Sequence, residues 1–136
     1  MSDAVFSRAL AKKPEELHPL VLAYIGDAVY ELFIRQLVAS GSNLRPNHLH
    51  RQSVRYVSAV AQSQALELVL PHLTETELEM VKKGRNTKSG TAPKHARIID
   101  YRRSTAFECL VGYLFAKGQH ERLRELLDIA VCGAGQ

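Results

Sequence analysis

Two carboxylates stand in segments that are otherwise apolar. Asp27 lies within Leu-Ala-Tyr-Ile-Gly-Asp-Ala-Val-Tyr-Glu, and Glu108 lies within Ser-Thr-Ala-Phe-Glu-Cys-Leu-Val-Gly-Tyr-Leu. A carboxylate buried without a partner is costly, so each of them needs an explanation. Asp27 could be hydrogen-bonded to an arginine or to a loop backbone, and Thr105 has the capping-box spacing to Glu108. The apolar stripe continues upstream to Ile98, however, which favours a longer helix with Glu108 inside it.

A glycine accompanies each carboxylate, Gly26 directly before Asp27 and Gly112 one turn after Glu108. A glycine inside a helix costs about 1 kcal/mol relative to alanine, which the close approach of two backbones would offset. If the two helices cross there, the carboxylates converge among apolar residues and repel each other unless one is protonated or a cation lies between them. Mg²⁺ suits such a pair, because it binds through one or two carboxylates and retained waters. Glu31 could be an outer ligand, or could equally pair with Arg35 four residues later.

The charges are segregated along the chain. Two acid-poor windows, 32–66 and 80–107, hold 12 of the 18 Lys and Arg residues and one of the 14 Asp and Glu residues. Such basic stretches are typical of a protein that binds a polyanion over a defined footprint, although basic solvated faces are the simpler alternative. A metal site beside them indicates phosphodiester chemistry, in which the metal activates water and stabilises developing charge.

Length and composition limit the class of protein. The chain has 136 residues, of which 46% are hydrophobic and 24% charged, so we expect one globular domain over residues 1–136. It has no apolar run long enough to cross a bilayer and no secretory signal pattern, which predicts a cytoplasmic protein. Cys109 and Cys132 are too few for a disulfide framework, and we expect both thiols to be reduced and unligated.

The elements that must position these residues read as helices, because apolar residues recur at spacings of three and four and no alternating run reaches strand length. We therefore predict an all-α fold with an apolar, central helix that begins at Pro19. Thr74 and Glu77 predict a capping box, and Gly84 and Gly118 predict helix ends. The predicted helices cover 19–40, 46–56, 57–70, 74–84, 99–116 and 120–131, with an irregular basic loop at 84–96.

Four segments in order carry a resemblance to a known family. They are Ile-Gly-Asp-Ala-Val at 25–29, Leu-Arg-Pro-Asn-His-Leu-His-Arg-Gln-Ser-Val at 44–54, Gly-Arg-Asn-Thr-Lys-Ser-Gly-Thr-Ala-Pro-Lys at 84–94, and the segment around Glu108. Together they resemble the ribonuclease III catalytic domain, and most closely its small stand-alone branch, Mini-ribonuclease III. The resemblance implies a helical homodimer that uses Mg²⁺ to hydrolyse double-stranded RNA, with Asp27 and Glu108 as catalytic metal-site carboxylates.

The sequence departs from the larger ribonuclease III pattern at Ala23 and Thr105, where that pattern has carboxylates. The Mini branch shares both departures, so they put in question the number of metal ions and not the activity itself. The chain is also too short for a C-terminal double-stranded RNA-binding domain, so RNA binding must come from the catalytic domain. The cations we expect to contact phosphates are Arg45, Arg51, Lys82, Lys83, Arg85, Lys88 and Lys94; His48 and His50 lie beside them and are given no catalytic role.

These inferences predict a Mg²⁺-dependent homodimeric endoribonuclease for structured RNA. The resemblance implies that it matures the large-subunit (23S) ribosomal RNA precursor, with a ribosomal protein as a further partner that presents the substrate. One alternative is a ribonuclease III-like protein that binds RNA or a ribosomal particle without cutting, which the residues at 23 and 105 favour. A second is a helical DNA-binding module, which would have no use for a buried Asp27.

Overall fold

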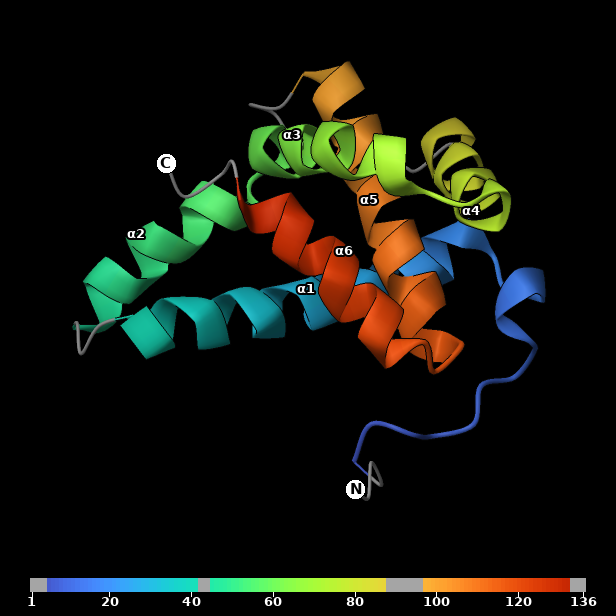
Figure 1. Ribbon diagram of the computed structural model, residues 1–136, viewed down its shortest axis with the longest axis horizontal. Helices are drawn as coiled ribbons and strands as arrows, with labels where there is room; N and C mark the ends of the chain where they lie inside the picture. Colours follow the sequence, from blue (N-terminus) through green and yellow to red (C-terminus); the bar gives the residue numbers. More distant parts are fainter. Residues whose placement is uncertain (1–4, 42–44, 88–96, 133–136) are drawn as a thin grey trace.

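The computed structural model describes residues 5–41, 45–87 and 97–132, and these residues form helices without any strand. The predicted all-α class is therefore confirmed for the described part of the chain. Figure 1 shows the helices in order: η1 (Pro14–Glu16), α1 (Pro19–Gly41), α2 (Pro46–Val57), α3 (Ala59–Val69), η2 (Leu70–His72), α4 (Glu75–Asn86), α5 (Ile98–Ala116) and α6 (His120–Cys132). None of the described helices is both long and apolar enough to cross a membrane.

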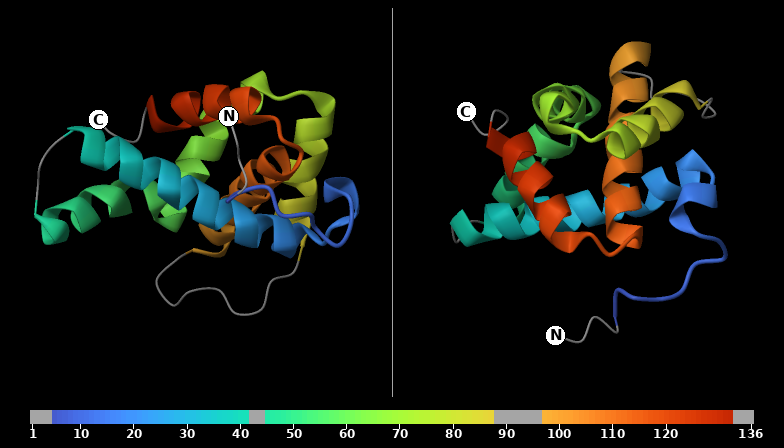
Figure 2. Two further views of the ribbon diagram at one scale, coloured as in Figure 1. Left: turned by 90° about the horizontal axis from the view of Figure 1, so that it is seen from below. Right: turned by 45° about the vertical axis from the view of Figure 1, so that its right-hand side comes forward.

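Helix α5 is the centre of the fold. It crosses α1 and packs against α3 and α4 as well, an arrangement that both views in Figure 2 show. Most side chains from Ser104 to Leu114 are buried, and Phe107 meets Tyr30 of α1 edge to face with ring centroids 5.0 Å apart. The prediction that the helix from Pro19 is central was therefore wrong. Helix α1 keeps one exposed apolar face because only one side of it lies against α5.

Local signals fix most of the helix boundaries. Thr74 and Glu77 form the predicted capping box, in which the Thr74 side chain accepts from the Glu77 N–H and the Glu77 carboxylate from the Thr74 N–H. Gly118 ends α5 with a φ of 75°, as predicted from its position. Ser58 caps α3 by accepting from the Ala61 N–H, so α3 begins two residues later than predicted.

Gly84 does not end α4, contrary to the prediction. The helix continues to Asn86, because Gly84 serves the contact with α5 and not a helix stop. A Cβ atom on Gly84 would lie 2.8 Å from the Cβ of Cys109 and 2.9 Å from the Cα of Ala106. This glycine lets α4 approach the segment of α5 that carries Glu108. The predicted loop from 84 is thus helical to Asn86, and residues 88–96 lie outside the described residues.

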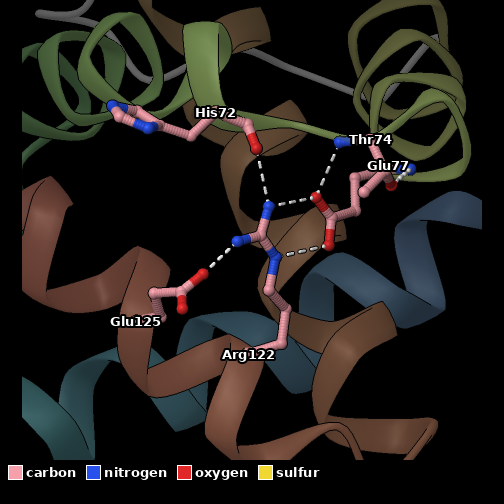
Figure 3. A network of polar contacts seen from close by, with 5 residues as sticks. All are labelled: His72, Thr74, Glu77, Arg122 and Glu125. Carbon is pink, nitrogen blue, oxygen red and sulfur yellow. Dashed lines mark hydrogen bonds and ion pairs between the residues drawn. The ribbon is translucent and has the colours of Figure 1, made fainter.

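A polar network joins α6 to α4 and η2 (Figure 3). The guanidinium of Arg122 donates to both carboxylate oxygens of the buried Glu77 at 2.9 Å, to the His72 carbonyl at 2.6 Å, and to Glu125. Leu123, Leu126 and Leu127 of α6 are buried beside this network, as the sequence predicted. The network therefore holds the C-terminal helix against the elements that support α5.

Candidate active site

Helices α1 and α5 cross at the two glycines, as predicted. A Cβ atom on Gly26 would lie 1.8 Å from the carbonyl oxygen of Glu108 and 2.8 Å from the Gly112 nitrogen. A Cβ atom on Gly112 would lie 1.9 Å from the carbonyl oxygen of Leu22. No other residue type fits at either position without moving a helix, so the two glycines set the distance between the helices that carry Asp27 and Glu108.

The crossing brings the carboxyl groups of Asp27 and Glu108 together. Burial, in the first place, and the contact with the Asp27 carboxyl group together raise the pKa of Glu108 to about 9. A neighbouring amide, that of Gln62 on α3, acts in the opposite direction. Two carboxyl groups this close cannot both ionise cheaply, so one of them keeps its proton unless a cation lies between them.

Only one of the two carboxylates is desolvated. Glu108 is partly buried where α3 approaches α5, whereas Asp27 is exposed, so the expectation of a buried Asp27 was wrong. The reason is rotation along α1. Gly26 faces α5, and the next residue is turned by about 100° around the helix, toward the open edge of the crossing. Asp27 therefore faces both Glu108 and solvent.

The structural alternatives for the two carboxylates are not observed among the described residues. Among the described residues, no cation forms a salt bridge with Asp27 or Glu108. Thr105 lies in the interior of α5 and donates its hydroxyl to the Tyr101 carbonyl at 3.0 Å, so it is not a helix cap for Glu108. The longer helix that the apolar stripe indicated is the one observed.

Glu31 lies one turn beyond Asp27, where its carboxylate accepts from Arg35 at 3.1 Å. This is the pairing given above as the alternative to a metal role. Within the described ranges, no three His, Cys, Asp or Glu residues are clustered closely enough to hold a metal ion. The protein carboxylates brought together are thus the pair Asp27 and Glu108.

Ala23 and Thr105, where the larger family pattern has carboxylates, are both only 6% exposed. Neither supplies a carboxylate, since Ala23 has no oxygen in its side chain and Thr105 has only a hydroxyl, whose proton is donated to the Tyr101 carbonyl. These two positions therefore add no charge beside the carboxylate pair.

Gln62 is a site residue that the sequence did not reveal. Its side chain is 3% exposed and lies beside the Glu108 carboxyl group, and its Nε2 donates to the Val57 carbonyl at 3.0 Å. Its Oε1 is buried and has no hydrogen-bond partner among the described residues. The available signal was the polar pair Gln62 and Ser63 on the apolar face of a predicted helix.

The predicted phosphate-binding cations that the structure describes are all exposed, namely Arg45, Arg51, Lys82, Lys83 and Arg85. The last three lie on the final turns of α4, and Gly84 between them contacts α5 next to Glu108. Arg45 and Arg51 lie at and within α2, which packs along α1. Lys88 and Lys94 fall outside the described residues. His48 shares a hydrogen bond with Gln52 at 3.1 Å, and His50 lines the groove between α1 and α2.

Comparison with known proteins agrees with this geometry. The ribonuclease III domain family matches residues 20–119. The Mini-ribonuclease 3 of Brevibacillus brevis is 47% identical over 89% of this chain and 90% of its own length. That of Symbiobacterium thermophilum is 50% identical over 86% of this chain and 90% of its own. A crystal structure of a Fusobacterium nucleatum protein has a TM-score of 0.81 at 25% identity and covers 90% of this chain and 98% of that one. The chain therefore belongs to the ribonuclease III family, within its Mini-ribonuclease III branch, and is an endoribonuclease.

Proposed function

We propose that this endoribonuclease is a cytoplasmic, Mg²⁺-dependent homodimer, and that its single catalytic domain, residues 1–136, hydrolyses phosphodiester bonds in double-stranded or structured RNA. The observation that carries the proposal is the Asp27 and Glu108 pair at the crossing of α1 and α5. Exposed cations of α4 lie on the helix that contacts α5 beside this pair. The site thus combines a place for a divalent cation with a surface for a polyanion.

The donor atoms fit magnesium. Asp27 and Glu108 offer hard carboxylate oxygens, the ligands that Mg²⁺ prefers. When bound, the ion lowers the pKa of a water nucleophile and stabilises charge that develops on the phosphate. Glu108 would hold the ion from the partly buried side and Asp27 from the solvent side, where a phosphodiester can reach it.

The RNA would be held by charge. Lys82, Lys83 and Arg85 on α4, and Arg45 and Arg51 beside α2, are candidates to contact phosphates on either side of the scissile bond. Lys88 and Lys94, on the segment that follows α4, extend the same basic stretch in the sequence. Because phosphate contacts read no base, the enzyme would select its substrate by the shape of the RNA helix.

The dimer would form through the exposed apolar face of α1. Val21, Tyr24 and Leu32 are 43%, 81% and 45% exposed and fall on one side of the helix, next to Asp27. A symmetric pair of such faces would bury them and bring two carboxylate pairs to one side of the dimer. One site could then cut each strand of a duplex.

We also propose that the natural substrate is the precursor of large-subunit (23S) ribosomal RNA, presented with the help of a ribosomal protein. The similarity to proteins named Mini-ribonuclease 3 over nearly their whole length supports this choice. The test is cleavage of radiolabelled precursor RNA by the purified protein, with and without Mg²⁺ and with unstructured RNA as the control.

The alternative is a family member that binds RNA without cutting it, which the buried, uncharged side chains of Ala23 and Thr105 favour. It predicts retention of the labelled RNA without cleavage at any Mg²⁺ concentration. The carboxylate pair argues against it, because RNA binding alone does not need two carboxyl groups facing each other beneath a basic surface.

A further inference from the structure

Helix α2 differs from the other described α-helices, because none of its residues is buried. It lies beside the second half of α1, at the end of the molecule opposite α4 (Figure 1), and packs mainly against α1 and α3. It contains no acidic residue, and Arg45 at its N-cap and Arg51 within it are exposed. A basic helix that buries so little needs another means of keeping a fixed direction.

Two side chains from neighbouring helices cap the C-terminal end of α2. The Tyr30 hydroxyl of α1 donates to the Tyr56 carbonyl at 3.2 Å, and Gln62 Nε2 of α3 donates to the Val57 carbonyl at 3.0 Å. The last carbonyls of a helix have no N–H partner within it, so both bonds satisfy groups at that end. Among the described residues, no other side-chain hydrogen bond or salt bridge joins α2 to another helix. The bond from Tyr30 is thus the polar link between α2 and α1.

Tyr30 is itself held rigidly. Its side chain is 1% exposed, and its ring meets that of Phe107 edge to face at 5.0 Å. Phe107 directly precedes Glu108, and Tyr30 lies three residues, about one helical turn, after Asp27. Burial raises the pKa of the Tyr30 hydroxyl, so it stays a hydrogen-bond donor at physiological pH. Tyr30 therefore connects the end of α2 to the crossing that carries the carboxylate pair.

Such a connection matters to a binding surface because an element that moves in the free protein must be ordered when its ligand binds, and that cost lowers affinity. We propose that Tyr30 is a positioning residue for RNA: its hydroxyl holds α2 by the Tyr56 carbonyl, so that Arg45 and Arg51 meet the phosphates of duplex RNA at a fixed place relative to the carboxylate pair. Tyr30 does this without touching RNA, since it is buried. This inference rests on the proposed role of the α2 cations in RNA binding.

Tyr30→Phe tests the proposal, because it removes one hydroxyl and keeps the ring that packs on Phe107. We expect labelled duplex RNA to bind about threefold to tenfold more weakly in filter binding without Mg²⁺, the usual range for the loss of one hydrogen bond. With Mg²⁺, KM for cleavage should rise while kcat stays unchanged, because binding is weakened and the carboxylate pair is untouched. Wild-type affinity, or a fall in kcat with KM unchanged, would overturn the proposal.

Tyr113→Phe is the matched control. Tyr113 of α5 is 3% exposed, and its hydroxyl donates to Glu15 at 3.3 Å, so this bond does not involve α2. Lys117 keeps the Glu15 carboxylate paired in the variant. Tyr113→Phe should bind RNA like the wild type. A loss equal to that of Tyr30→Phe would mean that any buried hydroxyl matters as much, which contradicts a specific role of Tyr30.

Hydrogen exchange of the RNA-free protein shows whether α2 itself responds. The amides of α2 should exchange faster in Tyr30→Phe than in the wild type, whereas those of α4 and α6 should not change. Unchanged exchange in α2 would contradict the positioning role. Equal acceleration in all helices would contradict it as well, because Tyr30 would then support the whole fold and not one helix.

Combining Tyr30→Phe with Arg45→Ala and Arg51→Ala separates this inference from the function on which it rests. If Tyr30 acts through these arginines, Tyr30→Phe should cause no further loss of RNA affinity in the arginine double variant. An undiminished further loss would contradict the proposal. If the arginine double variant binds RNA weakly while Tyr30→Phe binds it like the wild type, the basic surface stands and only the role of Tyr30 fails. If the arginine double variant binds like the wild type, both fail.

Discussion

Gly26 and Gly112 face each other across the contact of α1 and α5, so closely that a Cβ atom on Gly26 would lie 2.8 Å from the Gly112 nitrogen and 1.8 Å from the Glu108 carbonyl oxygen. Both obstructing atoms belong to the backbone and cannot rotate away. The relationship between these two glycines therefore sets the separation of the helices, and with it the distance between Asp27 and Glu108.

Gly26→Ala and Gly112→Ala should each destabilise the protein by about 3 kcal/mol or more, because overpacking against backbone forces the helices apart. The free energy of unfolding in urea measures the effect. RNA cleavage by the protein that remains folded should fall as well, since the carboxylates separate.

Gly41→Ala is the control for the glycine variants. A Cβ atom there would meet no atom within 4 Å, and the residue lies at the end of α1. It should leave stability unchanged or raise it by up to about 1 kcal/mol through helix propensity. A loss in Gly41→Ala as large as in Gly26→Ala would mean that the cost is conformational and not a clash.

The Arg122 network predicts a specific acid sensitivity. The Arg122 guanidinium lowers the pKa of buried Glu77 below its ordinary 4.5. Stability from this pair is therefore fully present above pH 4.5 and is lost as pH falls toward the lowered pKa, because the unfolded chain binds the proton first. Arg122→Ala should cost about 3 kcal/mol at pH 7, since it leaves a buried carboxylate without its cation.

Urea denaturation at several pH values from 7 to 3 measures this dependence. The free energy of unfolding of Arg122→Ala should fall less steeply with decreasing pH than that of the wild type. Arg35→Ala is the matched control, because Arg35 pairs with Glu31 in the same way on an exposed surface, at 68% and 42% side-chain exposure. It should change stability by less than about 0.5 kcal/mol. If Arg122→Ala and Arg35→Ala changed the free energy of unfolding equally, the buried network would contribute no more to stability than an exposed ion pair.

The cations on α4 and beyond it should bind RNA and not stabilise the fold. Lys82→Ala with Lys83→Ala should weaken RNA binding and reduce the slope of log affinity against log salt by about 0.9 for each phosphate contact removed. Lys88→Ala with Lys94→Ala should do the same. Filter binding at several salt concentrations measures both, and thermal unfolding should remain near that of the wild type.

Arg124→Ala on α6 controls for net charge, because Arg124 is 71% exposed and paired with Asp128. It should leave the salt dependence unchanged. A collapse of thermal stability in the lysine variants, with normal affinity in the protein that survives, would assign these lysines a structural role instead.

The apolar face of α1 predicts dimerisation. Sedimentation at micromolar concentration should give a mass near twice the 15.2 kDa of the chain. Tyr24→Glu should yield a folded monomer with much lower activity on duplex RNA, because Tyr24 is 81% exposed and contributes to the face without supporting the core. A wild-type monomer that is fully active would contradict the dimer.

Much of the fold followed from local sequence signals. Thr74 with Glu77, and Gly118 after the last apolar position of α5, act through the backbone of their own helix, so their effect does not depend on distant packing. The crossing at Gly26 and Gly112 could also be predicted, because a glycine inside an apolar helix has few other uses.

The remaining features depend on which neighbours surround a helix, and that information is not local. From the sequence alone Gly84 is predicted to end a helix, and only its contact with α5 explains why it does not. Likewise, Asp27 is predicted to be buried, and only the side of α1 that faces α5 shows that it is exposed. Gln62 lies 46 residues before Glu108, and nothing in its own segment indicates that α3 carries it to that carboxylate.

Conservative changes to the carboxylate pair give the decisive test of cleavage. Asp27→Asn removes the charge that would hold Mg²⁺ at nearly constant shape. Glu108→Gln does the same, and it mimics the protonated carboxyl group that a pKa of about 9 implies for the metal-free protein at pH 7. The free energy of unfolding of each variant should therefore lie within about 0.5 kcal/mol of the wild-type value, because no new cavity or buried charge is created.

Cleavage of labelled structured RNA should be abolished in each of these variants, while RNA binding is retained because the cations of α4 are untouched. The double variant should be little worse than either single one, since the two carboxylates act on the same cation as a unit. Single-turnover rates across a Mg²⁺ titration measure this. If Asp27→Asn cut RNA at the wild-type rate at every Mg²⁺ concentration of the titration, the pair would not be the catalytic site, because a weakened metal site would lose activity at low Mg²⁺ and be rescued only at high Mg²⁺.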